Sequence, residues 1–228
     1  MDDPRELPIG CDCGALRGAL VGASARRGNR VVCYCDDCQA YAHHLGCAAR
    51  ALDAYGGTEV FQTSPANVVL RDGLSHLACL QLRPAGLLRW YASCCRSPLG
   101  NTLARPGVPF VGLVVRTLAA PAGGAGPDAA GAPALAPDVD AALGPVRGAI
   151  FGKFARGGAP LRDARARPPL GLVARSVALL AAARLRGDHV RSPFFDAGRG
   201  APVVAPCVLH PDELAAAEAA ARRAPIRS

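Results

Sequence analysis

Short apolar runs separated by turn residues dominate the first half of the chain. The runs cover residues 15–21, 30–33, 59–63, 67–70, 76–82, 87–91 and 110–116. Turn formers separate them, as in Arg71-Asp72-Gly73 and Pro84-Ala85-Gly86. Many short strands without alternating helices predict an assembly of antiparallel sheets.

Helical spacing of apolar residues is found in four segments. Within residues 36–54 we expect one helix that begins at Asp36 as its cap. Further helices are predicted for residues 139–154, 170–186 and 211–223. The helix predicted for residues 170–186 has an apolar stripe, which we expect to pack into the core. The stripe consists of Leu172, Val173, Val177, Leu180 and Leu185.

These patterns divide the chain into three parts. Residues 5–118 are predicted to form a mainly β domain, and residues 138–228 a helical C-terminal extension, which makes the protein α+β overall. Between them, residues 119–137 are nearly all Ala, Gly and Pro, a composition that buries too little apolar surface to order itself. We therefore expect a mobile linker there.

Composition narrows the class of protein. Half of the 228 residues are hydrophobic, so a core can form, and the formal net charge is +8. The arginines are scattered instead of forming a dense run, which disfavours a nucleic-acid partner. No apolar stretch is long enough to cross a membrane, and the N-terminus is acidic, so we expect an unexported, cytoplasmic protein without a membrane partner. In that compartment the ten cysteines are not expected to form disulfides.

Seven of the cysteines lie in short clusters, and this pattern predicts zinc binding. They form three clusters, which are Cys11 and Cys13, then Cys33, Cys35 and Cys38, then Cys94 and Cys95. Thiolates one or two residues apart on a turn can share one tetrahedral zinc ion, so we expect one or two ions per chain. The middle cluster has three thiolates, which leaves one coordination position for water or substrate, and makes Cys33, Cys35 and Cys38 the candidate reactive site.

Two other interpretations of the clusters remain open. All seven cysteines can instead serve closed zinc sites that only stabilise the fold. A redox dithiol at Cys35 and Cys38 is disfavoured, because no βαβ pattern surrounds it.

Some chemically capable residues lie outside the clusters. Cys47, Cys79 and Cys207 have the surroundings of small buried hydrophobic residues. His43 and His44 follow the middle cluster and are candidate ligands or acid-base groups, although an ordinary surface or core position is the simpler interpretation. Asp36 and Asp37 also have two interpretations. The simpler one is that they cap a helix, and the other is that they support the metal ligands from the second layer of residues around the metal.

At these cysteines the chain resembles the family of glutathione-dependent formaldehyde-activating enzymes and centromere protein V, and within it an uncharacterised bacterial branch. The likeness covers residues 7–116. It depends on C-x-C-G from Cys11, C-x-C-x-x-C from Cys33, and R-W-Y followed by C-x-S-P-L from Arg89 to Leu99.

The resemblance implies a β-tent fold with two zinc sites. Cys11 and Cys13 would join cysteines of the third motif around a structural zinc, and Cys33, Cys35 and Cys38 would hold the catalytic one. It also implies a substrate that is an adduct of glutathione with formaldehyde, and an activity of the carbon-sulfur lyase class. In the family, the neighbourhood that corresponds to Gln39 faces the substrate pocket.

The third motif departs from the family pattern, C-x-x-C-G. Alignment on Ser97-Pro98-Leu99 puts Ala92 at the first cysteine, Cys95 at the second and Arg96 at the glycine. Cys94 then replaces the missing ligand if the chain turns there. Alternatively, Cys94 turns toward Cys33, Cys35 and Cys38 and closes their site.

Two functions compete at this point. The first is a zinc-dependent, lyase-like enzyme that acts on a small thiol or thiol adduct. The second is a non-catalytic zinc module that binds a protein or nucleic-acid partner through its basic C-terminal half.

Overall fold

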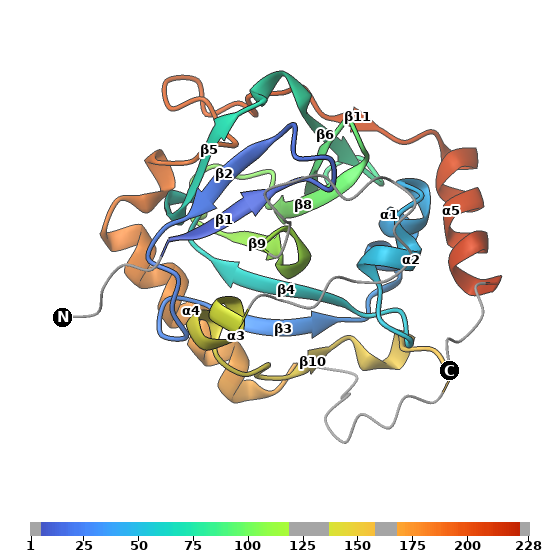
Figure 1. Ribbon diagram of the computed structural model, residues 1–228, viewed down its shortest axis with the longest axis horizontal. Coiled ribbons are helices and arrows are strands. Elements are labelled where there is room, and N and C mark those ends of the chain that lie inside the picture. The colour runs from blue at the N-terminus through green and yellow to red at the C-terminus, as the bar shows by residue number, and fades with distance from the viewer. Residues whose placement is uncertain (1–5, 119–136, 158–167, 224–228) are drawn as a thin grey trace.

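The computed structural model describes residues 6–118, 137–157 and 168–223, which form two β-sheets with helices around them (Figure 1). The smaller sheet is antiparallel and has the order β1 (Leu7–Gly10), β2 (Arg17–Leu20), β5 (Val68–Asp72). The larger sheet has eight strands in the order β10-β3-β4-β9-β8-β7-β6-β11. Its strands are β3 (Asn29–Cys33), β4 (Thr58–Thr63), β6 (Leu77–Gln81), β7 (Leu88–Ala92), β8 (Ser97–Thr102), β9 (Val111–Val114), β10 (Ala149–Ile150) and β11 (Cys207–Val208).

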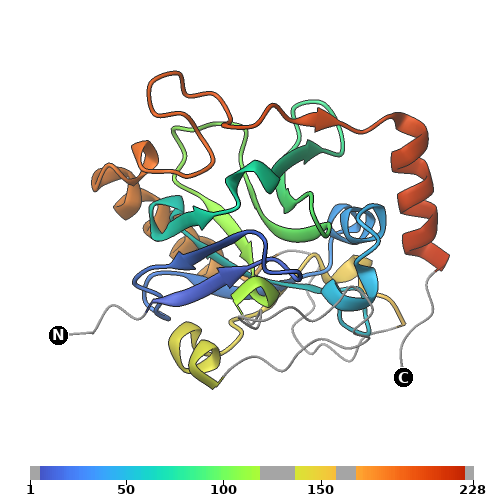
Figure 2. The ribbon, with the colours of Figure 1, turned by 45° about the horizontal axis from the view of Figure 1, so that its top comes forward.

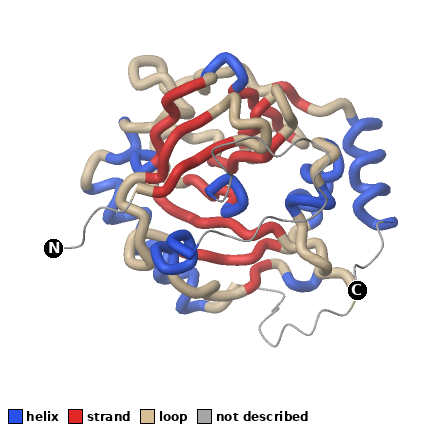
Figure 3. Tube along the Cα trace, viewed as in Figure 1, coloured by secondary structure: helices blue, strands red, loops and turns tan. Residues whose placement is uncertain are grey.

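The described residues also form five α-helices, which lie at the margins of the sheets (Figure 3). They are α1 (Asp36–His44), α2 (Ala48–Ala51), α3 (Pro137–Leu143), α4 (Leu170–Leu185) and α5 (Pro211–Arg223). In Figures 1 and 2, α1 and α5 lie side by side at the end of the molecule opposite α4. None of the helices in the described ranges is long and apolar enough to cross a membrane.

The main core joins residues of both sheets with residues of the C-terminal part. Trp90 on β7 is fully buried, and its ring centroid lies 4.9 Å from that of Phe194, which follows α4. The indole N–H of Trp90 donates a hydrogen bond to Thr102 Oγ1 on β8, so its polar atom is satisfied inside the core. Phe194 thereby ties the chain beyond α4 to the central strands.

The predicted mainly β, α+β fold with C-terminal helices is confirmed, and each of the seven predicted strands overlaps an observed one. Four strands were missed, which are β1, β8, β10 and β11. β8 contains Pro98 and Gly100, which weaken a strand signal, while β10 and β11 have only two residues each.

Two helix predictions need correction. The helix expected over residues 139–154 ends at Leu143, because Gly144 takes a left-handed φ of 71° and Pro145 follows it. The rest of that segment forms β10 and a 3-10 turn. The helix expected over residues 36–54 is two helices, and the first is capped by Cys35 instead of Asp36.

The apolar stripe of α4 was also assigned wrongly to the core. Leu172 is buried, but the side chains of Val177 and Leu185 are 59% and 89% exposed. A helix rich in Ala, Val and Leu is apolar around most of its circumference, so the sequence did not show which face is covered.

The C-terminal part extends both edges of the larger sheet. β10 pairs in parallel with β3, and β11 pairs in parallel with β6. The division into a zinc domain and a helical extension stays a prediction, and the predicted linker lies outside the described residues except for Pro137, where α3 begins.

Candidate metal centres

The first cysteine group gathers four sulfurs from two distant turns. Cys11 Sγ lies 3.5 Å from Cys13 Sγ and 3.7 Å from Cys94 Sγ, and Cys94 Sγ lies 3.9 Å from Cys95 Sγ. A tetrahedron with zinc-sulfur bonds of 2.3 Å has edges of about 3.8 Å. The spacing therefore matches a zinc tetrahedron and is far too long for disulfides.

Two tight turns point these sulfurs at one another. In the first, Gly14 has a φ of 74° and its N–H donates to the carbonyl of Cys11, while the N–H of Leu16 donates to Cys11 Sγ. In the second, Arg96 has a φ of 58°, so it takes the left-handed conformation that glycine adopts easily. The backbone of Arg96 thus closes this second turn.

The structure places Cys94 with Cys11 and Cys13. Its Sγ lies 3.4 Å from Cys13 Sγ, although 81 residues separate the two cysteines in the sequence. Cys94 therefore groups with Cys11, Cys13 and Cys95. This arrangement does not follow the alternative in which Cys94 closes the middle cluster.

Arginine pairs fix the first turn to the rest of the protein. Asp12 lies between Cys11 and Cys13, and its carboxylate accepts from Arg50 Nε at 3.1 Å and pairs with Arg116 Nε at 3.4 Å. Its backbone N–H donates to Ser97 Oγ, which also lies 3.1 Å from Cys95 Sγ. Burial raises the pKa of Cys95, but the Ser97 hydroxyl and nearby backbone N–H groups outweigh it and lower that pKa to about 7.

The second group is the predicted trio, and it lies where β3 ends and α1 begins. Cys33 Sγ lies 3.4 Å from Cys35 Sγ and 3.8 Å from Cys38 Sγ. Within the described ranges, no further Cys, His, Asp or Glu ligand atom belongs to this group. The N–H of Cys38 donates to Cys35 Sγ, so one cysteine caps the helix that carries another. A helix N-terminus favours the negative charge of thiolates.

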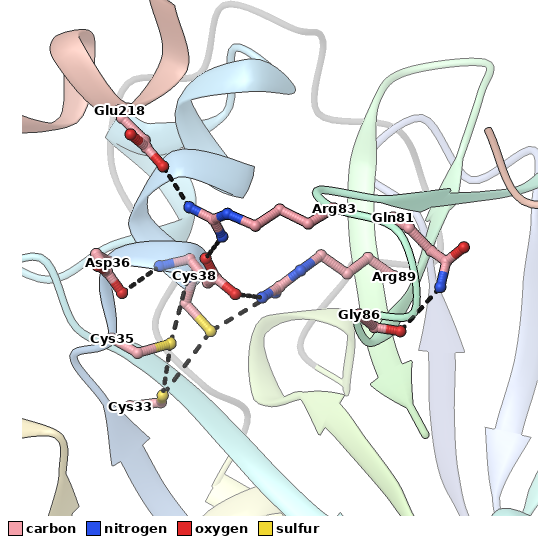
Figure 4. A network of polar contacts seen from close by, with 10 residues as sticks. Cys33, Cys35, Asp36, Cys38, Gln81, Arg83, Gly86, Arg89 and Glu218 are labelled. Carbon is pink, nitrogen blue, oxygen red and sulfur yellow. Dashed lines mark hydrogen bonds and ion pairs between the residues drawn. The ribbon is translucent and has the colours of Figure 1, made fainter. Parts of the chain in front are cut away.

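A buried arginine accompanies this trio (Figure 4). Arg89 on β7 has a side chain only 3% exposed, and its Nη1 donates to Cys38 Sγ at 3.7 Å. Its guanidinium also lies 3.5 Å from the carboxylate of Asp37 and stacks over the ring of Tyr41. A buried cation requires a negative partner, and here that partner is sulfur as well as carboxylate.

The charge distribution within the trio follows from these contacts. Hydrogen bonds from Cys33 and Cys35, helped by the Arg89 guanidinium, hold the pKa of Cys38 well below its usual range. Hydrogen bonding to Cys35 and Cys38 raises the pKa of Cys33. Of the three thiols, Cys38 is thus the one that these contacts favour as a thiolate, and binding of a metal cation would favour loss of the other protons.

One cavity touches this second group, and another is lined by residues next to its cysteines in the sequence. One of about 20 Å³, room for roughly one water molecule, touches Cys38 and Arg89. A larger one of about 520 Å³ is lined by Asp36 and Gln39, the sequence neighbours of Cys35 and Cys38. Gln39, whose neighbourhood the resemblance implies to face a substrate pocket, lines this cavity. Its Oε1 accepts a hydrogen bond from Arg156 Nε at 2.7 Å, which fixes Arg156 in the same wall.

Several candidates from the sequence lie outside both groups. His43 and His44 belong to neither set of candidate ligands, and Cys47 and Cys79 are buried among apolar residues, as expected. Cys207 was expected to be buried but is exposed on the edge strand β11. Asp37 pairs with Arg83 and Arg89, which places it beside the second group without being a ligand.

Sequence reasoning about sites overlooked Arg89 as a partner of the trio. Its position in R-W-Y was noted only as part of a motif. A signal was present, since an arginine inside a run of strand-forming apolar residues is expected to be buried and therefore paired.

Both groups can hold a metal ion, and their donor sets fit zinc. Four sulfurs at tetrahedral spacing make a complete set for a structural ion, and three leave one position for another ligand.

Comparison with protein-family models gives one match, to a family of unknown function (DUF6151), over residues 4–205. No curated protein matches the chain.

Proposed function

The chain belongs to this DUF6151 family, and from the two cysteine groups we propose that it is a zinc protein whose second group binds a small thiol or thiol adduct. The activity proposed for that group is of the carbon-sulfur lyase class, with a glutathione adduct of formaldehyde as the substrate. The observation that carries the proposal is the contrast between four gathered sulfurs in the first group and three in the second.

The first group supplies stability in this proposal. It joins the turn after β1 to the turn between β7 and β8, which lie more than 80 residues apart. A structural zinc of this kind contributes on the order of 10 kcal/mol to folding.

The second group supplies the chemistry. Bound zinc would lower the pKa of a thiol and fix its sulfur. The chain's own residues balance the charge, since the α1 N-terminus and Arg89 both favour anionic sulfur beside Cys38. Arg89 and Tyr41 also fill the space around that sulfur and leave a cavity of only about 20 Å³ on that side.

The larger cavity supports a substrate with charges of both signs. Its wall holds the carboxylates of Asp36 and Glu218 and the guanidinium groups of Arg83, Arg156 and Arg222. A glutathione-type thiol carries an ammonium group and two carboxylates, so both kinds of wall residue have a counterpart on it. The resemblance of residues 7–116 to the glutathione-dependent formaldehyde-activating enzymes favours the same substrate class.

The test is calorimetric titration of the zinc-loaded protein with glutathione and with S-methylglutathione, which lacks the free thiol. We expect glutathione to bind one per chain and S-methylglutathione to bind at least tenfold more weakly. Removal of zinc, or Cys38→Ser, should abolish the difference.

A matched measurement addresses the reaction. Exchange of the methylene group between formaldehyde and its glutathione adduct, followed by nuclear magnetic resonance, should accelerate with wild type and not with Cys38→Ser. If the protein carries two zinc ions yet does not bind glutathione at millimolar concentration, the enzymatic proposal is refuted and a non-catalytic zinc module is favoured.

A further inference from the structure

A large cavity lies far from both cysteine groups. It has a volume of about 670 Å³ and lies between α4 and the ends of β3 and β4 where Asn29 and Thr63 stand. Cys33 is at the opposite end of β3, so the cavity and the second cysteine group are separated by the length of that strand. Figures 1 and 2 show α4 at that end of the sheet, away from α1 and α5.

Polar contacts hold α4 in place beside this cavity. Asn29 is fully buried, its Nδ2 donates to Ser176 Oγ at 2.9 Å, and its Oδ1 accepts from Arg175 Nε at 2.8 Å. At the N-terminal end of the helix, Leu172 packs into a buried cluster with Val31 and Ile150. The C-terminal half of the helix instead borders the cavity.

One wall of the cavity is apolar. Leu179, Leu180 and Ala183 of α4 line it, together with Pro109 and Phe110 from the chain before β9. An apolar wall gains free energy when an apolar group replaces water, at about 25 cal/mol per Å² of surface covered. This wall suits the hydrocarbon part of a ligand.

The opposite wall is polar but satisfied by the protein itself. Thr63 Oγ1 donates to the carbonyl of Arg27 and accepts from Asn67 Nδ2, and Ser64 Oγ accepts from the N–H of Ala66. These groups therefore shape the cavity and do not select the charge of its occupant.

The charge of the occupant is set by arginine. Arg26, Arg27, Arg186 and Arg191 line the cavity, and Asp188 is the only acidic residue among the described lining residues. Asp188 is buried, and its carboxylate accepts from Arg186 at 2.9 Å and from Arg191 at 2.6 Å. Asp188 balances one of the two guanidinium groups that it contacts, and Arg27 adds another positive charge, so these three arginines leave an excess of about two positive charges.

We propose that this cavity binds an organic anion with an apolar body, whose head group is a carboxylate or a phosphate and meets the arginines. Its volume is within the range of about 300–1,000 Å³ that small-molecule sites have. Guanidinium groups bind carboxylate and phosphate in a bidentate manner, so either head group fits the same chemistry. The proposal is independent of the function proposed for the second cysteine group.

The test uses three probes that share one ten-carbon chain, which are decanoate, decyl phosphate and decyltrimethylammonium. Calorimetric titration of the full-length, zinc-loaded protein below micelle-forming concentrations should show one-to-one binding of at least one anion. That anion should bind at least tenfold more tightly than the ammonium probe, and the comparison of decanoate with decyl phosphate identifies the head group.

Variants locate the binding. Leu180→Trp, which fills the cavity, should weaken anion binding at least tenfold, whereas Leu170→Trp on the exposed outer face of the same helix should leave it unchanged. Arg27→Gln should weaken it about threefold to tenfold, while Arg184→Gln, which removes a charge on α4 that does not line the cavity, should not. Ala182→Phe provides a second filling variant if Leu180→Trp does not fold.

Three results would overturn the proposal. The first is that neither anion binds at 1 mM, and the second is that the ammonium probe binds as tightly as the anions. The third is that Leu170→Trp weakens binding as much as the filling variants, which would assign the probe to the outer face of α4.

Discussion

Arg89 gives the sharpest test of the second cysteine group. Its guanidinium is nearly excluded from water and lies 3.7 Å from Cys38 Sγ and 3.5 Å from the carboxylate of Asp37. At an effective dielectric constant of about 20, opposite unit charges at this separation attract by about 4 kcal/mol. Removal of one partner from a buried ion pair typically destabilises a protein by about 3–5 kcal/mol, which agrees with that value.

We therefore expect Arg89→Met to weaken the binding of the second zinc ion. The substitution keeps much of the side-chain volume but removes the charge that balances the thiolates. A loss of about 4 kcal/mol corresponds to roughly a thousandfold in affinity. Because Arg83 still pairs with Asp37 at 2.6 Å, the measured loss should lie between a hundredfold and a thousandfold.

The assay is competition with a chromophoric zinc chelator, in which two ions of different affinity give two steps. In Arg89→Met the step of the second group should shift, and the step of the first group should not. Arg83→Met is the matched control, because that side chain is half exposed and does not touch sulfur, and it should shift neither step more than threefold. An unchanged second step in Arg89→Met would refute the view that Arg89 balances this group.

Three further predictions follow from the geometry. Cys94→Ala should lower the zinc content from two ions to one and lower the melting temperature, since it removes one of four gathered sulfurs, whereas Cys207→Ala on the exposed edge should change neither. Phe194→Ala should reduce the free energy of unfolding by about 3–5 kcal/mol in urea titrations, because the ring is buried against Trp90, and a loss under 1 kcal/mol would show that the C-terminal segment is not part of the core. Zinc affinity should fall as the pH is lowered from 8 to 6, because the pKa of Cys33 is raised in the metal-free protein and its proton must leave before the metal binds; affinity independent of pH would contradict this.

Much of the fold was predictable because its signals are local. Strands such as β4 and β7 are short apolar runs bounded by turn residues, and each was found within two residues of its observed position. Strands β10 and β11 were not predictable, because two residues make no pattern and their pairing depends on the edges of a sheet that residues before 118 build.

The cysteine sites were likewise predictable only where their residues are close in the sequence. Cys33, Cys35 and Cys38 lie within six residues, so a turn between a strand and a helix is enough to bring their sulfurs together. The partner of Cys94 was not decided by spacing, since a turn at residues 93–96 can point adjacent side chains to either side. The left-handed backbone of Arg96 and the register of β7 against β8 decided it.

By itself, the sequence determined which atoms are available to bind metal and that most of them lie in a β-rich half, because ligand type and strand periodicity are properties of neighbouring residues. Only the tertiary structure decided that Cys94 joins Cys11 and that Arg89 lies against Cys38. It also decided that α4 leaves a basic cavity and an exposed apolar face. Each of these depends on elements far apart in the chain, whose contacts are set by sheet register and by packing.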